Sequence, residues 1–264
     1  MKSIVRIFAL VLRYFYLIKS SLPRILELMY WPTVQMVLWG LITKHFIVSS
    51  DWLTQATGVL IAGVLLWDIL FRSQLGFSLS FLEEMWSRNL GQLFVSPIRP
   101  IEMVLSLMTI SLIRTVIAMI PAILLAIPLY AFNLFELGFI LIFFFANLLI
   151  SGWILGIFVI AGILRFGVSA ESLAWLGIFI LAPLSAIYYP VSVIPEWLRW
   201  LSLSLPQTYI FEGMREILFN SVIRSDYMLK AVIFNVIFMF IGIVIFLIAF
   251  EGARKRGALL NIGE

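Results

Sequence analysis

Few ionisable residues lie within the long apolar stretches of this 264-residue chain, and two of them, Asp68 and Arg72, are four positions apart. On a helix this spacing puts both side chains on one face, where they can pair near the cytoplasmic end of an apolar stretch. A proton relay is the alternative, but no chain of further carboxylates continues from Asp68. The spacing therefore favours a charge-neutral structural pair.

Arg114 also lies inside an apolar stretch and has no obvious partner nearby in the sequence. It can pair with Asp68 or Glu136 from another helix, or contact an anionic substrate, and the sequence does not choose between these. Glu27 and Gln35 flank Pro32, a pattern that fits a polar pathway and ordinary hydrogen bonding between helices equally well.

The motifs of catalysis and metal binding are missing. The sequence has no Gly-rich phosphate loop, no cysteine and only one histidine, His45, so thiolate and histidine-rich metal sites are excluded. We therefore expect no enzymatic activity and no cofactor bound by this chain. If ATP drives the protein, ATP and Mg must bind to a separate subunit.

Composition indicates a membrane protein. Hydrophobic residues make up 63% of the chain and charged residues 12%, whereas soluble domains are about half apolar and about a quarter charged. The net charge of +4 comes from basic residues beside apolar runs, where they suit anionic lipid headgroups. We expect no nucleic-acid partner.

Six apolar stretches approach or exceed the roughly 20 residues that cross a bilayer. This predicts an all-α integral membrane fold with six transmembrane helices, in one domain of residues 23–264. The expected spans are 26–47, 54–76, 103–130, 136–163, 172–189 and 229–250.

Residues 1–22 precede these spans and read as an amphipathic helix. At about 100° per residue, Lys2, Arg6 and Arg13 fall on one narrow face, with apolar residues opposite. Such a helix lies in the membrane interface.

Basic residues are distributed unequally between the two sides of the predicted bundle. One side collects Lys2, Arg6, Arg13, Lys19, Arg24, Arg72, Arg88, Arg99, Arg165, Arg254, Lys255 and Arg256; the other has Lys44, Arg199, Arg215, Arg224 and Lys230. Because cytoplasmic loops are enriched in Lys and Arg, the first side should be cytoplasmic, together with both termini.

Two connections are long enough to carry function. The cytoplasmic one, residues 77–102, is an amphipathic segment of mixed charge that ends at Pro97 and Pro100. The external one, residues 190–228, has aromatic and charged residues at helical spacing, which predicts one short helix around Trp197 to Leu205 and a second from Tyr209 to Phe219.

This layout resembles the permease family of type-2 ABC exporters, the ABC-2 permeases, over essentially the whole chain. The most specific segments are SRNLGQLFVSPIRP, at residues 87–100, and YYPVSVIPEWLRWLSLSLPQTYIFEGMR, in which prolines introduce successive helices. In that family the first segment couples to the ATPase, and the second forms short re-entrant external helices before the last span.

The resemblance implies two cytoplasmic ABC ATPase subunits per complex and a second copy of this chain or a close relative. It also implies the inner membrane of a bacterial cell as the location. By carry-over, the ATPase-coupling surface would comprise Glu83, Glu84, Trp86, Arg88, Leu90, Phe94 and Pro97. The external gate would comprise Pro190, Pro195, Pro206, Glu212 and Arg215.

The expected function is export of an amphipathic substrate, such as a lipid-linked glycan, a glycolipid or a drug-like molecule. One alternative is an ion-coupled secondary transporter that uses Asp68, Arg114 and Glu136, although the matched halves typical of such carriers are not visible. The other is a membrane scaffold that uses residues 77–102 only for docking.

Overall fold

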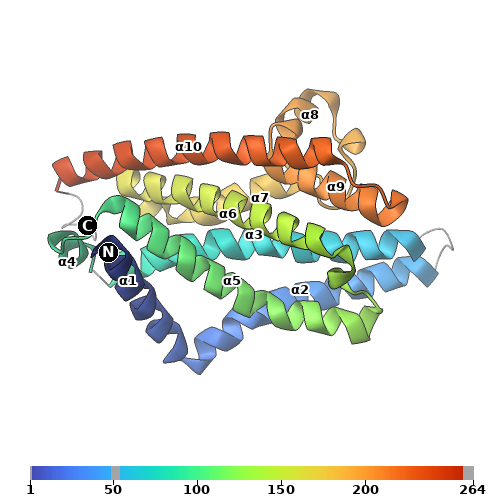
Figure 1. Cartoon of the computed structure of the whole chain (residues 1–264), viewed down its shortest axis with the longest axis horizontal. Helices are drawn as coiled ribbons and strands as arrows, with labels where there is room; N and C mark the ends of the chain where they lie inside the picture. Colours follow the sequence, from blue (N-terminus) through green and yellow to red (C-terminus); the bar gives the residue numbers. More distant parts are fainter. Residues whose placement is uncertain (1, 49–53, 88, 258–264) are drawn as a thin grey trace.

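The computed structural model describes residues 2–48, 54–87 and 89–257, and this part of the chain is helical without strands. Figure 1 shows long helices side by side, with shorter elements at both ends. The elements are α1 Lys2–Lys19, α2 Leu22–Val48, α3 Thr54–Trp86, α4 Leu90–Val95, α5 Pro100–Tyr130, η2 Leu134–Leu137, α6 Phe139–Phe166, η3 Val168–Ser172, α7 Leu173–Leu184, η4 Val191–Val193, α8 Glu196–Leu203, α9 Pro206–Asn220 and α10 Ser225–Lys255.

Within the described residues, five helices are long and apolar enough to cross a membrane: α2, α3, α5, α6 and α10. They contain five of the six predicted spans almost entirely. The remaining prediction, 172–189, differs, because α7 ends at Leu184 and its 12 residues reach only about 18 Å of the roughly 30 Å of hydrocarbon. Helix α7 is thus a short apolar helix, and irregular backbone follows it.

Helix α3 lies at the centre of the bundle. In its most apolar window 89% of the residues are buried, against 17% in α2 and 22% in α10. Helices α5 and α6 pack along it, and α10 packs on α6 (Figure 1). The helix also continues ten residues beyond the predicted boundary at residue 76, so the first part of the predicted cytoplasmic connection is an extension of a span.

The α3–α6 contact depends on small residues. A Cβ atom on Gly152 of α6 would lie 2.6 Å from the carbonyl oxygen of Leu70, and the Ser73 hydroxyl donates to the carbonyl of Leu149 at 2.8 Å. Small side chains let helix backbones approach closely, which is how helices associate where lipid provides no hydrophobic drive. The sequence of α6 thus fixes how deeply α3 is enclosed.

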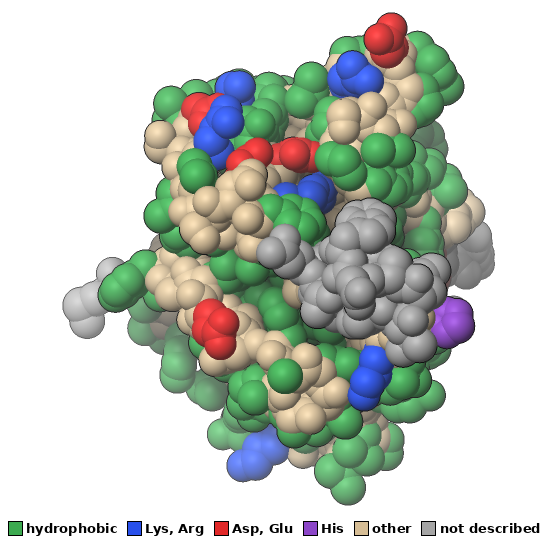
Figure 2. Space-filling model, turned by 90° about the vertical axis from the view of Figure 1, so that its right-hand side faces the viewer, with side chains coloured by type: hydrophobic (Ala, Val, Ile, Leu, Met, Phe, Trp, Pro, Cys, Tyr) green, Lys and Arg blue, Asp and Glu red, His purple; other side chains and the backbone are tan. Residues whose placement is uncertain are grey.

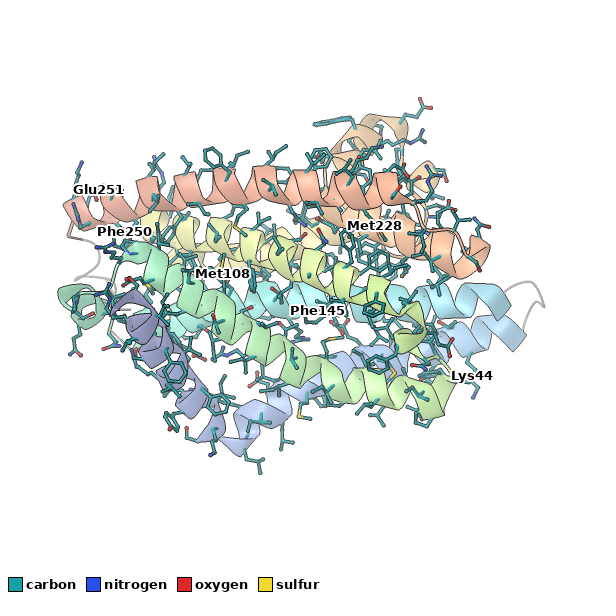
Figure 3. The ribbon with its side chains drawn as sticks, viewed as in Figure 1. Lys44, Met108, Phe145, Met228, Phe250 and Glu251 are labelled. Carbon is teal, nitrogen blue, oxygen red and sulfur yellow. The ribbon has the colours of Figure 1, made fainter. Side chains whose placement is uncertain are left out.

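The two ends of the bundle differ in what they carry. Helix α1 begins and α10 ends at one end, while α8 and α9 lie toward the other (Figure 1). Figure 3 places Lys44 and Glu251 at opposite ends, as the predicted order of the spans requires. Seen from the Lys44 end, Figure 2 shows charged side chains of both signs on the end face and hydrophobic ones over the flanks.

We expect Gly152→Ala to destabilise the bundle by about 1–3 kcal/mol, because the added methyl group overpacks the contact with α3. Gly252→Ala is the matched control, since a Cβ atom there meets nothing within 4 Å and alanine favours a helix. Thermal unfolding of the detergent-solubilised protein measures both. Equal melting temperatures for the two variants would contradict this account of the α3–α6 contact.

Candidate functional site

Helix α3 is unusually polar for a helix enclosed in a membrane protein. Most of its polar side chains lie on the part between Asp68 and Glu84, and they are buried. The buried set is Asp68, Arg72, Ser73, Gln74, Ser78, Ser80 and Glu84. Charges in this setting face a bundle interior or a cavity because exposure to lipid is costly.

A cavity of 390 Å³ opens beside this part of α3. Helices α2, α3 and α5 line it together with η3 and α7, and α1 contributes one residue. Its lining combines charged, aromatic and aliphatic side chains: Ile18, Arg24, Glu27, Leu28, Trp31, Arg72, Leu75, Gly76, Leu79, Glu83, Trp86, Arg114, Glu171 and Trp175. Such a mixed surface suits an amphipathic ligand.

Arg114 of α5 forms an ion pair with a residue of α3 in the cavity lining. Its Nη2 atom lies 3.0 Å from Oε2 of Glu83, and the two side chains are 6% and 25% exposed. Arg114 pairs with neither of the partners expected from the sequence. Asp68 lies nearer the start of α3 than Glu83 does, and Glu136 is exposed in η2, before α6 begins. Glu136 therefore lies outside α6, because that helix starts three residues later than predicted.

Asp68 and Arg72 share a face of α3, but no ion pair or hydrogen bond joins them in the described structure. Both carboxylate oxygens of Asp68 and two guanidinium nitrogens of Arg72, Nε and Nη2, have no hydrogen-bond partner. Arg72 instead lies 5.0 Å from the centre of the Phe71 ring. The pair also sits near the middle of α3, since the helix continues to Trp86.

The first helix is fastened to the bundle by two ion pairs that the sequence analysis did not foresee. Arg13 donates to Oε2 of Glu84 at 2.9 Å, and Arg6 donates to Oε2 of Glu102 in α5 at the same distance. The hydrogen bond to Glu102 raises the pKa of the Arg6 guanidinium. Two of the basic residues expected at lipid headgroups therefore bind carboxylates of the chain itself.

The predicted coupling residues take different positions. Glu84 and Leu90 are buried, and Glu83 faces Arg114. Trp86 is 51% exposed at the end of α3, and Pro97 is exposed after α4. Arg88 and the side chain of Phe94 lie outside the described residues. The accessible part of this set is thus the end of α3 and the turn after α4.

The predicted external gate residues hold the chain after α7. Arg215, buried in α9, donates from Nη1 to the carbonyl of Ala186 and from Nη2 to that of Tyr189, each at 2.8 Å. Glu212 accepts from the Val191 amide at 2.8 Å and lies 3.3 Å from Arg215. These contacts satisfy backbone groups of an irregular segment, which hydrocarbon alone cannot do.

The three prolines of this region stand where helices begin. Pro190 precedes η4, Pro195 precedes α8, and Pro206 is the first residue of α9. Proline is favoured at a helix start because its missing N–H has no intrahelical role there. The structure has short helices where both were predicted, α8 and α9.

A comparison with protein-family models identifies the chain over residues 7–219 as an ABC-2 type transporter. This range includes most of α1, the cavity and the segment held by Arg215. The chain belongs to the ABC-2 type transporter family. A search of curated proteins found no match.

Family membership establishes the general role. The protein is a multi-pass membrane protein and a permease component of an ABC transporter. The ABC-2 membrane domain is a transport unit that lacks a nucleotide-binding domain. The resemblance drawn from the two proline-containing segments is confirmed.

Sequence reasoning missed Glu83 as the partner of Arg114. A usable signal was present, because residues 77–86 contain no proline or glycine that would end the preceding helix. The cavity contributions of Trp31, Glu171 and Trp175 had no such signal, since they come from segments far apart in the sequence.

We expect Glu83→Gln to destabilise the protein by about 3 kcal/mol, because it leaves the Arg114 charge buried without its partner. Arg114→Gln should cost less, since Glu83 is partly exposed, and the double variant should cost less than the two single changes together. Thermal unfolding in detergent supplies the free energies of unfolding of the wild type, the two single variants and the double variant.

The exposed pair Arg254–Glu251 is the matched control, with side chains 65% and 41% exposed. Its coupling should stay below about 0.5 kcal/mol. Additive effects of the Glu83 and Arg114 changes would show that this ion pair does not hold α5 to α3.

Proposed function

We propose that this chain is the membrane-spanning subunit of an ATP-driven exporter. It moves an amphipathic substrate, such as a lipid-linked glycan, a glycolipid or a drug-like molecule, outward across the cell membrane. Two separate ATPase subunits bind ATP and Mg, and a second copy of the chain or a close relative completes the pathway. The membrane is the inner membrane of a bacterial cell, with both termini in the cytoplasm.

The observation that carries this proposal is the continuity of α3. This helix has 33 residues and is about 50 Å long. One rigid element therefore connects the cavity residues Arg72 and Glu83 with Trp86, which also lines the cavity and is half exposed. A partner that moves the Trp86 end must move the cavity wall as well. Family membership supports an ATPase as that partner.

Helix α1 supports the same mechanism. Because Arg13 binds Glu84 of α3 and Arg6 binds Glu102 of α5, α1 links the two helices that flank the predicted coupling segment. Both carboxylates are almost fully buried, at 2% and 5% exposure, so separating the helices would leave charges unpaired. The coupling end is thus built to move as a unit.

The Arg215 clamp is suited to the opposite end of the pathway. It fixes the backbone between α7 and α8 by hydrogen bonds to two carbonyls. In the proposed exporter this segment and helices α8 and α9 form the external cap. The hydrogen bonds from Arg215 would keep the carbonyl groups of this irregular segment paired while the rest of the bundle moves.

We expect the tagged protein, purified from its native membrane in mild detergent, to retain a P-loop ATPase in a one-to-one ratio. Trp86→Ala should weaken that association by about 2 kcal/mol, about thirtyfold, because an exposed aromatic anchor is lost. Recovery of ATPase per permease, measured by quantitative mass spectrometry, is the readout.

Trp197→Ala is the control, since Trp197 in α8 is 72% exposed at the other end of the bundle. Glu84 is less suitable as a target, because its removal would strand Arg13. Recovery of the permease alone in several detergents would refute the exporter assignment. Equal ATPase recovery with both tryptophan variants would move the coupling surface away from Trp86.

A further inference from the structure

The charges around the cavity are balanced. Three arginines and three glutamates line it, and one of each, Arg114 and Glu83, neutralise each other. The other charged residues of the lining are two arginines, Arg24 and Arg72, and two glutamates, Glu27 and Glu171. A ligand with a single net charge would meet as much repulsion as attraction in this setting.

Arg72 is the buried member of this set and has unused hydrogen-bonding capacity. It is 8% exposed, and its Nε and Nη2 atoms have no partner, nor does Nε of the neighbouring Arg114. Buried donors without partners are costly, and a guanidinium fork matches the geometry of a phosphate. Asp68 and Glu27 already act electrostatically on Arg72, but its free N–H groups can still donate to an anionic group in the cavity.

The rest of the lining is acidic and aromatic. Glu27 in α2 and Glu171 in η3 make no hydrogen bond or ion pair within the described structure, although Glu27 acts electrostatically on Arg72. Trp31 and Trp175 belong to the same lining. Carboxylates and tryptophan faces both attract an ammonium group. Trp31 and Trp175 are also 50% and 42% exposed, so each side chain is accessible to an apolar chain.

We propose that the cavity binds the headgroup of a zwitterionic amphiphile, and this rests on the proposed export function. Arg72, with Arg114, takes the phosphate; Glu27 and Glu171 take the ammonium; the acyl chain leaves between Trp31 and Trp175. The proposal narrows the substrate class to molecules that carry a phosphate and an amine on an apolar tail.

The test uses the full chain purified in detergent and native mass spectrometry, with palmitoyl lysophosphatidylethanolamine as the probe. The wild type should bind it about tenfold more tightly than palmitoyl lysophosphatidylglycerol, which has the phosphate but no ammonium, because one charge-assisted contact is missing. Equal binding of the two lipids would overturn the proposal.

Variants separate the two halves of the site. Arg72→Gln should weaken binding of both lipids about tenfold, whereas Glu171→Gln and Glu27→Gln should remove the preference for the ethanolamine headgroup. The glutamate variants change partly or fully exposed side chains, so they remain informative if Arg72→Gln does not fold. Unchanged preference in both glutamate variants would refute the assignment of the ammonium.

Arg165→Gln and Glu196→Gln are matched controls, because both residues are exposed and lie outside the cavity lining.

Free phosphoethanolamine distinguishes the ligand sources. If it fails to compete with the lysolipid probe, the ligand is an amphiphile, whereas full competition overturns the requirement for a tail.

ATPase recovery from the same preparation keeps this inference distinct from the proposed function. Selective lipid binding without an ATPase would refute only the exporter assignment. An ATPase with unselective lipid binding would refute only the headgroup site.

Discussion

The structure depends on burying a polar helix inside a membrane protein. Helix α3 carries two acids and an arginine deep in the bundle, Asp68, Glu84 and Arg72, and each would be costly against lipid. The other helices must therefore surround it. The close approach of α6 at Gly152 and the ion pairs supplied by α1 and α5 are the means by which this is done. The exposed apolar faces of α2 and α10 then remain for lipid or a partner chain.

This arrangement connects stability with function. The residues that hold α3 in place at one end, Glu83 and Glu84, adjoin the exposed Trp86, and the cavity begins on the same turns. A helix whose two sides are fixed by ion pairs moves only with its neighbours. Force applied at the end of α3 would consequently reach the cavity as a change of its shape, which a flexible loop could not transmit. The proposed coupling and the proposed ligand site are parts of one mechanical unit.

Much of the fold was predictable because membrane insertion leaves clear marks in a sequence. Apolar length gave five spans, prolines gave the starts of α8 and α9, and the amphipathic pattern gave α1. The predicted span at 172–189 was wrong in extent, because the residues after Leu184 are apolar and yet follow an irregular path held by Arg215. Hydropathy measures transfer into lipid and does not distinguish a helix from backbone that another helix satisfies.

The sequence by itself determined that the chain is a helical membrane protein without a phosphate-binding loop and that it resembles ABC-2 permeases. These properties follow from composition and local pattern, which residue order contains directly. Only the tertiary structure decided that Arg114 pairs with Glu83, that no hydrogen bond joins Asp68 and Arg72, and that Glu27, Glu171 and three tryptophans share a cavity. Such contacts depend on which helix faces meet and at what depth, and that is set by packing across the whole bundle rather than by spacing along one helix.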